Sequence, residues 1–577
     1  MSGRVILTAV ATGGMAILSA CGSSGNHNNN PAVLVSPATM NVQQGSTQQF
    51  TATVINSNNP AVNWLVNGII GGNASVGTVN STGLYTAPLV TPNPPTATVT
   101  AVSQANTNVS GSAIVTITAV LFNNSSLKGT YIFSLSGIDL NGFTFYAVGA
   151  LTADGNGNIT GGEEDLNDVS TGYFTANPVT GTYSVGAGGR GTMTLKTSIG
   201  SFIYAFAMRA LSSAGLNEID NNVISATGDL EQQASGVTTP SGNFAFGFTG
   251  LALSCGAFDS IGIFRLGSGN VGGTQDLNCS GTITQSQSLS GTYGVIDSLG
   301  RGTGMFSAST GIAHFVYYAA SASRYRFLCP DVATFFLGSA DLQTQQSFAS
   351  IDFYGNYVIA ASANTHAGIS YTLIQLNASN GNISTGFYDV NDTGTVGRAS
   401  LTGAYNLASN GRLSGSFTVT TSSLPFSMYL VSPAQAYYLD QRSNAVGGGN
   451  IYAQSSAVTS NANWAGSYAT KQFGYFIANH VVLPGNSTSV SGQISADGIG
   501  TLAGTLDLND PTNVFTGQTL QGNYSVGNVA PGRSTVAITT PAEGTRNYVA
   551  YIVDQSRVLL LETDSNLTSG GDAIRQF

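Results

Sequence analysis

The chain has 577 residues, too many for one hydrophobic core, and this length predicts several domains of about 100 to 150 residues each. Only 8% of the residues are charged, and the formal net charge is −10 with 17 Lys and Arg in total. Nucleic acid and other polyanions need clustered cations, so this composition excludes them as partners. The 42% hydrophobic content is ample for packed cores.

The N-terminus carries a short apolar segment that starts after Arg4 and ends in Leu18-Ser-Ala-Cys21. Its length of about 16 residues falls short of the ~20 that span a bilayer, which argues against the alternative of an uncleaved transmembrane helix. The final four residues resemble a lipobox, and residues 1–20 resemble a bacterial lipoprotein signal peptide. This resemblance implies a lipoprotein in which Cys21 is acylated, with palmitate for example, and becomes the first residue of the mature chain.

Residues 21–31 form a polar tether of Gly, Ser, Asn and His without apolar periodicity. The membrane is therefore an expected partner through the acyl chains on Cys21. Gly22 follows the cysteine where an Asp would direct retention at the inner membrane, so the resemblance favours the outer membrane and the cell surface. No later segment has ~18 uninterrupted apolar residues, and we expect the rest of the chain to lie outside the bilayer.

Residues 32–120 read as short strands separated by Gly, Asn and Pro. Phe50, Ala52 and Val54 alternate in the manner of a half-buried strand. The opening Val-Ser-Pro, the Gly-Ser-x-x-Gln-Phe-x-Ala strand, Trp64 and the Gly-Leu-Tyr-Thr-Ala-Pro turn at 83–88 resemble a bacterial Ig-like domain of the group-2 type. The resemblance implies a β-sandwich with Trp64 in its core, of a kind that serves mostly as a spacer or adhesion module.

The remaining part of the chain is a tandem repeat of four copies, and the copies share landmarks in a constant order. Each copy opens on Gly-x-aromatic, continues through Asp-x-Asn, a second Gly-x-Tyr and a Gly-Arg pair, and closes near a Gln. The opening aromatic residues are Tyr131, Phe244, Tyr357 and Tyr468, and the tyrosines of the second motif are Tyr183, Tyr293, Tyr405 and Tyr524. The closing glutamines are Gln232, Gln345, Gln454 and Gln576.

These landmarks divide the region into residues 127–235, 236–346, 347–455 and 456–577. Solenoid and propeller units of ~20 to 50 residues depend on their neighbours, whereas copies of ~110 residues are long enough to fold alone. Each copy holds roughly eight strand-like runs joined by short Gly/Asn/Asp turns. The predicted fold class is therefore all-β, with four small up-and-down β-barrels after the Ig-like domain; open sandwiches with the same strands are the alternative.

The Asp of Asp-x-Asn and the Arg of Gly-Arg keep a separation of 25, 25, 23 and 26 residues in the four copies. We expect the two side chains of each copy to meet across adjacent hairpins as a structural clamp that fixes strand register. The functional alternative is that the Arg holds a ligand carboxylate or a sugar. The pairs expected within one copy are Asp165 with Arg190, Asp276 with Arg301, Asp389 with Arg412, and Asp507 with Arg533.

Cysteines other than Cys21 occur only in the second copy, at Cys255, Cys279 and Cys329. In an oxidising exterior we expect pairing. A hairpin centred near residues 267–269 places Cys255 opposite Cys279, which makes this the preferred disulfide and leaves Cys329 as a buried thiol. The other two pairings stay open.

No motif in the chain predicts a catalytic group, a metal site or a cofactor. His314, His366 and His480 fall in three separate places, and none belongs to a nucleophile motif. The loop that starts at Asp154 resembles a calcium loop only in part, because Ile159 stands where the turn glycine is required. The carboxylates Glu163 and Glu164 have no matching pair in the other copies, which disfavours a glycosidase site.

The expected function is a non-enzymatic surface or adhesion module, with surface glycans or other surface proteins as partners. The alternative is a binding protein that holds small hydrophobic or saccharide ligands inside the barrels, and an extracellular hydrolase comes third. Barrels filled with large side chains would favour the first, and an open cavity would favour the second. The adjacent aromatic pairs at 317–318, 335–336 and 437–438 suit core packing or sugar stacking.

Overall fold

The structure, a computed structural model, describes residues 30–73, 75–88, 91–92, 94–119, 121–220, 222–308, 311–456, 458–478, 481–527 and 530–576. Cys21, the expected signal peptide and most of the expected tether lie outside these residues. The described part is almost entirely β, and no helix in it is long and apolar enough to cross a membrane. Its helices are short 3-10 turns: η1 (Asn124–Ser126), η2 (Ser350–Asp352) and η3 (Asn461–Asn463).

The N-terminal domain consists of three small sheets around one core, in which Phe50, Trp64 and Tyr85 are buried. The sheets have the orders β1-β4, β2-β11-β10-β5-β6 and β3-β9-β8-β7. The strands are β1 (Ala32–Ser36), β2 (Thr39–Gln43), β3 (Thr47–Gln49), β4 (Thr51–Ile55), β5 (Val62–Val66), β6 (Ile69–Ile70), β7 (Gly72–Asn73), β8 (Gly77–Val79), β9 (Leu84–Thr86), β10 (Thr96–Ser103) and β11 (Ser110–Thr118).

The first repeat forms a closed barrel in which β13 pairs with β12 on one side and with β14 on the other. The irregular fourth position is divided into β15 and β16, and both pair with β14. The strands are β12 (Lys128–Asp139), β13 (Thr144–Asp154), β14 (Asn158–Asp168), β15 (Gly172–Pro178), β16 (Thr180–Val185), β17 (Arg190–Lys196), β18 (Ser201–Ala210), β19 (Ser213–Glu218) and β20 (Val223–Gln232).

The other three repeats are closed eight-stranded meanders in which the last strand pairs with the first. Barrel 2 has β21 (Gly242–Ala252), β22 (Gly256–Gly267), β23 (Asn270–Cys279), β24 (Thr282–Tyr293), β25 (Arg301–Ala308), β26 (Gly311–Ser321), β27 (Arg324–Leu328) and β28 (Thr334–Leu342). Barrel 3 has β29 (Gly355–Thr365), β30 (Gly368–Ser379), β31 (Asn382–Asp392), β32 (Thr395–Leu407), β33 (Arg412–Val419), β34 (Ser422–Ser432), β35 (Gln435–Asp440) and β36 (Ala445–Ala453). Barrel 4 has β37 (Ala465–Ala478), β38 (Val481–Asp497), β39 (Thr501–Asn509), β40 (Val514–Val526), β41 (Arg533–Thr540), β42 (Gly544–Asp554), β43 (Arg557–Glu562) and β44 (Leu567–Arg575). The prediction of closed barrels is confirmed, and the open sandwich is wrong.

The interior of each barrel is filled by large side chains. Along β12, Tyr131, Phe133 and Leu135 belong to the core of barrel 1, as the two-residue period of a strand requires. The core of barrel 2 is dominated by phenylalanine and tyrosine rings stacked on one another. A cavity within this core measures about 10 Å³, which is no more than the space of one water. The barrels are packed cores rather than containers.

The tyrosine of the second Gly-x-Tyr motif closes one end of each barrel. Its hydroxyl donates to a backbone carbonyl in the segment that precedes the first strand, so this segment is held across the barrel end. The bonds run from Tyr183 to Leu127 at 2.6 Å, from Tyr293 to Pro240 at 2.7 Å, from Tyr405 to Phe353 at 2.8 Å and from Tyr524 to Trp464 at 2.6 Å. This landmark of the sequence therefore has a structural role in all four copies.

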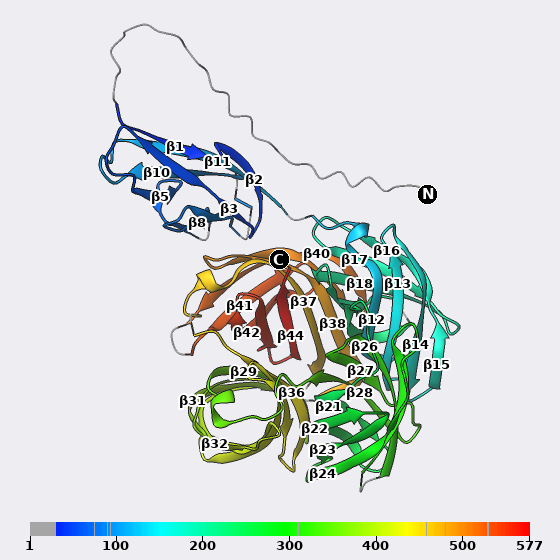
Figure 1. Ribbon diagram of the computed structural model, residues 1–577. Coiled ribbons are helices and arrows are strands. Elements are labelled where there is room, and N and C mark those ends of the chain that lie inside the picture. The colour runs from blue at the N-terminus through cyan, green and yellow to red at the C-terminus, as the bar shows by residue number, and fades with distance from the viewer. Residues whose placement is uncertain are drawn as a thin grey trace.

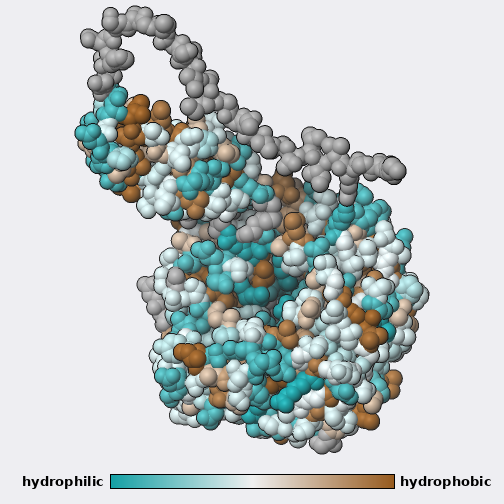
Figure 2. Space-filling model, viewed as in Figure 1, coloured by the Kyte–Doolittle hydropathy of each residue, from teal (hydrophilic) through white to brown (hydrophobic). Residues whose placement is uncertain are grey.

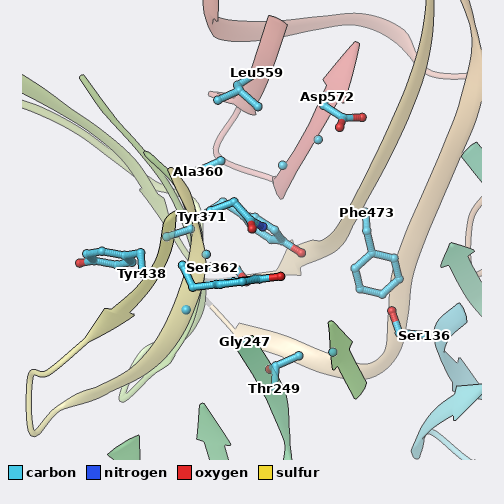
Figure 3. A pocket seen from close by; sticks show the side chains of 18 of the residues that line it. Ser136, Gly247, Thr249, Ala360, Ser362, Tyr371, Tyr438, Phe473, Leu559 and Asp572 are labelled. Atoms are coloured by element: carbon cyan, nitrogen blue, oxygen red, sulfur yellow. The ribbon is translucent and has the colours of Figure 1, made fainter. Parts of the chain in front are cut away.

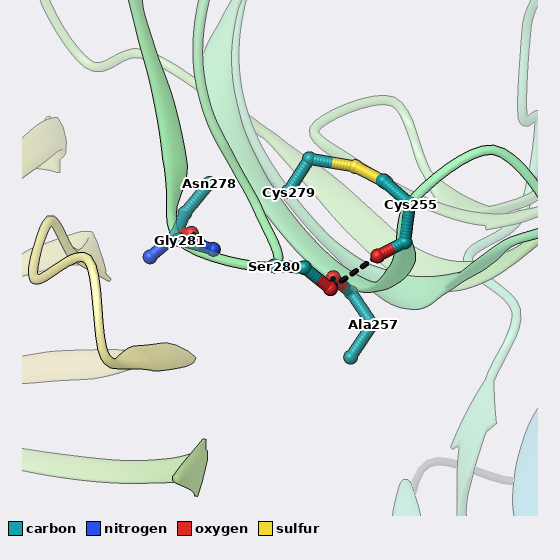
Figure 4. Close-up of a disulfide and its surroundings, with 6 residues drawn as sticks. All are labelled: Cys255, Ala257, Asn278, Cys279, Ser280 and Gly281. Carbon is teal, nitrogen blue, oxygen red and sulfur yellow. Dashed lines mark hydrogen bonds between the residues drawn. A yellow bond between two sulfur atoms is a disulfide. The ribbon is translucent and has the colours of Figure 1, made fainter. Parts of the chain in front are cut away.

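A disulfide joins Cys255 to Cys279, the pair expected from the hairpin, with a Cα–Cα distance of 5.9 Å (Figure 4). It links the turn between β21 and β22 to the end of β23 and closes a loop with a sequence separation of 24. Loops of this size contribute ~3 kcal/mol when they are cross-linked. Cys329 is a free thiol in the core of barrel 2, and burial raises its pKa, so it is unreactive.

Candidate functional site

The eight residues of the expected clamp form four ion pairs, but each pair joins two barrels. Arg301 of barrel 2 binds Asp165 of barrel 1, and the residues are 136 positions apart in sequence. The other pairs are Arg412 with Asp276, Arg533 with Asp389, and Arg190 with Asp507. The expected pairing within one copy is therefore wrong. The constant separation arises because both residues occupy fixed strand positions in every copy, and the Asp faces the next barrel.

The Asp165 carboxylate has several hydrogen-bond donors besides the arginine. It accepts hydrogen bonds from Arg301 through Nε (2.7 Å) and Nη2 (2.9 Å), from the hydroxyls of Tyr173 (2.5 Å) and Tyr318 (2.7 Å), and from the backbone of Ala176 (3.2 Å). Burial alone would raise its pKa, but the hydrogen bonds from Arg301 and the two tyrosines outweigh burial and hold the pKa below its usual value. The bidentate fork is the geometry that arginine provides and lysine does not.

In three barrels a β-bulge lies beside the Asp. The register between strands three and four shifts at Asp165, Asp276 and Asp507, where two residues of strand four face one residue of strand three. One of the two has positive φ, and its backbone N–H donates to the carboxylate: Ala176, Ser286 and Gly517. Barrel 3 has no register shift at Asp389, and this Asp still pairs with Arg533. The bulge therefore adds a backbone donor to the carboxylate and is not required for the contact between barrels.

The Asn of Asp-x-Asn also binds the following barrel. Its side-chain amide donates to a backbone carbonyl at the end of strand seven of that barrel, where the ladder leaves carbonyls unpaired. The bonds run from Asn167 to Cys329 at 2.8 Å, from Asn278 to Asp440 at 2.8 Å, from Asn391 to Glu562 at 2.9 Å and from Asn509 to Glu218 at 2.8 Å.

A glutamine after the last strand of each barrel makes the third repeated contact. Its amide donates to a carbonyl of strand six in the next barrel: Gln233 to Ala319 at 2.9 Å, Gln343 to Leu430 at 2.8 Å, Gln454 to Ile552 at 2.8 Å and Gln576 to Met208 at 2.8 Å. Two of these differ from the glutamines expected from the sequence, because Gln233 replaces Gln232 and Gln343 replaces Gln345.

All three contacts run from each barrel to the following one, and the fourth barrel makes them with the first. Strands one to three of each barrel pack against strands six to eight of the next, including β37, β38 and β39 against β18, β19 and β20. Figure 1 shows the four barrels around a common centre. Repeated head-to-tail contacts with a rotation that closes produce a ring. The chain is a closed ring of four barrels with approximate fourfold symmetry.

Among the described side chains, apolar clusters occur at three of the four junctions. Examples are Ile132 with Tyr318 between barrels 1 and 2, Ile263 with Tyr429 between barrels 2 and 3, and Val358 with Tyr551 between barrels 3 and 4. The junction of barrels 4 and 1 carries polar contacts instead. Ser225 bonds Ser487 at 2.5 Å, and the Ser489 hydroxyl donates to Asn217 at 2.6 Å. Buried hydroxyl and amide groups thus join the Arg190–Asp507 and Lys471–Asp229 ion pairs in the closing junction.

The ring surrounds a cavity of about 500 Å³ to which every barrel contributes. Figure 2 shows a hollow between the barrels with hydrophilic residues around it. Two positions of the first strand face the cavity in each barrel, because the alternate residues of that strand fill the barrel core. They are Ser134 and Ser136, Gly247 and Thr249, Ala360 and Ser362, and Lys471 and Phe473. The cavity volume lies within the range of small-molecule sites.

Two positions of the last strand complete the lining of the cavity in each barrel: Thr227 and Asp229, Leu337 and Ser339, Gly448 and Asn450, and Gly570 and Asp572. The residue between them is glycine in all four copies, at 228, 338, 449 and 571. A Cβ there would lie 2.1 or 2.2 Å from a carbonyl oxygen of the first strand. Sequence reasoning missed this landmark, although Thr-Gly-Asp, Leu-Gly-Ser, Gly-Gly-Asn and Gly-Gly-Asp repeat at one place.

The charged side chains beside the cavity pair with one another. Asp229 binds Lys471 Nζ at 2.9 Å and Arg209 at 2.7 Å. Burial would raise the pKa of Asp229, but the two cations hold it well below its usual value. Arg326 binds Glu231 at 2.5 Å. These contacts join three barrels and neutralise the charges within the wall of the ring.

Asp259 differs, because no cation pairs with its carboxylate among the described residues. It lines the cavity on β22 and is 8% exposed. Its Oδ1 lies against Gly448 of barrel 3, at 3.0 Å from the point where a Cβ would stand if Gly448 were another residue. Burial, opposed by a hydrogen bond with Thr249 and assisted by Asp440, raises its pKa to about 7. At the equivalent position of barrel 3, Tyr371 lies against Gly570 of barrel 4. Figure 3 shows Tyr371 and Phe473 entering the cavity from different barrels.

The paired aromatic residues divide between two environments. Tyr317, Phe336 and Tyr438 lie in barrel cores. Their sequence neighbours lie between barrels: Tyr318 donates to Asp165, Phe335 belongs to the junction of barrels 1 and 2, and Tyr437 donates to Asp341 at 2.7 Å. Adjacent buried aromatics therefore mark strands with two buried faces.

The structure brings no expected catalytic or metal-binding residues together. His314 contacts Asp331 at 2.8 Å and is largely exposed, whereas His480 lies outside the described residues. The Asp154 carboxylate accepts two backbone N–H groups of its own turn. Glu164 accepts a hydrogen bond from Asn177 in the wall of barrel 1. Within the described residues there is no group of three His, Cys, Asp or Glu side chains placed to hold a metal ion.

Glu562 provides a pH-dependent test of the interior of barrel 4, because its side chain lies on the same face of β43 as the core residues Val558 and Leu560. Burial and the nearby Asp564 raise its pKa from 4.5 to about 9. The folded state keeps the proton while the unfolded state loses it, so stability falls as the pH rises from about 4.5 to about 9. We expect Glu562→Gln to raise Tm by several degrees at pH 9 and to change it little at pH 5, as measured by calorimetry. An equal change at both pH values would contradict a buried neutral acid.

The fold and site define a class of architecture: a single-chain ring of four up-and-down barrels around an axial cavity.

No family model and no curated protein matches this chain. Solved structures with some similarity are transferrin-binding proteins B. Intact Ap-TbpB with its N and C lobes has 11% identity, covers 63% of this chain and 84% of its own, and has a TM-score of 0.18. The isotype 1 protein from serogroup B Neisseria meningitidis is 10% identical, and the match covers 64% of this chain and 83% of that protein with a TM-score of 0.18.

A tryptophan-to-alanine mutant of transferrin-binding protein B from Haemophilus parasuis Hp5 is 10% identical, and the match covers 65% of this chain and 85% of that protein with a TM-score of 0.16. Scores at this level do not establish a shared arrangement of the domains.

Proposed function

We propose that this chain is an exported, lipid-anchored and non-enzymatic binding protein of the cell surface, with surface glycans or other surface proteins as its partners. The observation that carries the proposal is the closed ring of barrels, with filled interiors and a cavity that all four barrels line. Large packed cores give a rigid scaffold, and they disfavour the alternative in which ligands enter individual barrels.

The N-terminal region supports the placement of this ring at a membrane surface. The lipobox-like motif ending at Cys21 suits acylation, and the polar residues after it suit a flexible tether. The N-terminal domain has the strand alternation and buried Trp64 expected of an Ig-like spacer. Together these parts would hold the ring away from the bilayer, where it can meet large partners.

The proposal is tested with the full-length chain expressed in a Gram-negative host with labelled palmitate. We expect label on the protein, its recovery in the outer membrane, and digestion by protease added to intact cells. Cys21→Ser should lose the label and leave the membrane fraction, whereas Cys329→Ser serves as the matched cysteine control. Retention of Cys21→Ser in the membrane would contradict lipid anchoring.

Surface binding is measured separately, with cells that display the chain and immobilised glycans and extracellular proteins. Adhesion above that of cells without the chain supports the binding role. Equal adhesion of the two cell types to every surface, with the protein shown to be exposed, would contradict it.

A further inference from the structure

The axial cavity combines a repeated framework with a lining that is not repeated. The Asp–Arg pair, the Asn, the Gln and the strand-eight glycine recur in all four copies. The four cavity-facing positions of each barrel differ, and one equivalent set reads Ser136, Thr249, Ser362 and Phe473. A ring with a symmetric frame and an asymmetric interior suits one asymmetric ligand on its axis.

The charges of the wall limit the kinds of ligand that fit. Lys471, Arg209 and Arg326 are already paired with carboxylates, so an anion would have to displace an existing ion pair. Asp229 is neutralised in the same contacts, which leaves Asp259 as the cavity carboxylate without a cation among the described residues. Displacing buried pairs is costly because it leaves an uncompensated charge. The wall therefore favours a neutral ligand.

The groups that remain available are hydroxyls, amides and aromatic rings. Ser136, Thr249 and Ser362 present hydroxyls from three barrels, and Asn450 adds an amide. The rings of Tyr371 and Phe473 enter the same space (Figure 3). A sugar has hydroxyls that both donate and accept, and an apolar face of C–H groups that packs on an aromatic ring. Lining of this kind gives orientation through a few polar groups and affinity through apolar contact.

We propose that the cavity on the ring axis is a binding site for a short neutral saccharide, with Phe473 and Tyr371 as stacking surfaces and Asp259 as an acceptor for ligand hydroxyls. This inference rests on the binding role proposed above and places the ligand between the barrels rather than inside them. A space of about 500 Å³ suits one or two sugar rings.

The test uses the full-length chain in detergent and a panel of maltose, cellobiose, lactose and N,N′-diacetylchitobiose, with sialic acid and glucosamine as charged comparators. Saturation-transfer NMR identifies a bound sugar, and calorimetry gives its Kd. We expect at least one neutral disaccharide to bind with a Kd below about 1 mM. Absence of binding by all four, or binding of the charged comparators alone, would overturn the proposal.

Two variants locate the site. Ser362→Trp places an indole in the cavity, and Phe473→Ala removes a stacking ring; each should weaken binding by about tenfold or more. The matched control Ser400→Trp lies on an exposed position of β32 in the same barrel and should bind like the parent chain. Unchanged Tm and elution volume show that the variants fold. If Phe473→Ala and Ser362→Trp bind normally while displaying cells still adhere, the surface role stands and the cavity is not the site.

Discussion

Asp165→Ala is expected to destabilise the chain by about 3–5 kcal/mol, the range for removing one partner of a buried ion pair. The substitution leaves the Arg301 guanidinium and the hydroxyls of Tyr173 and Tyr318 without their shared acceptor. The pKa of Asp165 is lowered in the fold, so its stabilising effect is present above the unfolded pKa and is lost as the pH falls. Calorimetry at pH 7 should therefore show a large loss that shrinks in acid.

A double-mutant cycle with Arg301→Ala separates the interaction energy of the Asp165–Arg301 pair from the other effects of each substitution on stability. Because the two residues contact one another across a junction, we expect the double variant to lose much less stability than the sum of the single variants. Asp154→Ala, in the turn between β13 and β14 of the same barrel, should cost much less, because the hydrogen bonds of Asp154 stay within that turn. Additive effects of Asp165→Ala and Arg301→Ala would mean that these residues do not interact in solution.

Gly338→Val is expected to prevent barrel 2 from closing. A Cβ at this position would lie 2.1 Å from the carbonyl oxygen of Gly247, and backbone on the paired strand cannot move without breaking the ladder. The cost exceeds about 4 kcal/mol, the level at which single substitutions become exceptional. We expect insoluble protein, or soluble protein with a separate low-temperature transition in calorimetry.

Gly272→Val is the matched control in the same barrel. A Cβ at this position meets nothing within 4 Å, and valine favours a strand. We expect its Tm to lie within a few degrees of the parent value. Normal folding of Gly338→Val would show that the close approach of the first and last strands is absent.

Strand periodicity and repeat length were sufficient to predict the closed barrels, because each copy is long enough to bury its own core. The hairpin around residues 267–269 was likewise sufficient to place Cys255 beside Cys279. The ring could not be predicted from the landmarks. The Asp and the Arg each recur once per copy, so their spacing is constant whether they meet within one copy or between two. The spacing therefore favours Arg190 as the partner of Asp165, whereas the structure pairs Asp165 with Arg301.

A local signal for the ring was present in the sequence. In a strand with one solvated face, apolar and polar residues alternate along the sequence. Tyr317 with Tyr318 and Tyr437 with Tyr438 instead place two large aromatic residues next to one another. Such pairs require burial on both faces, which an isolated barrel does not provide. The side chains that line the axial cavity gave no such signal because they differ between the copies, although the strand-eight glycine between them repeats.

Closure of the ring between barrels 4 and 1 is the central claim, and a disulfide across that junction tests it most directly. Ser225 and Ser487 are 262 residues apart in sequence, and their hydroxyl oxygens lie 2.5 Å apart in the closing junction. In Ser225→Cys/Ser487→Cys, air oxidation should form a cross-link that peptide mass spectrometry identifies and that speeds migration on a non-reducing gel. Two cysteines that stay fully reactive to alkylation after oxidation, in a folded protein, would contradict a closed ring.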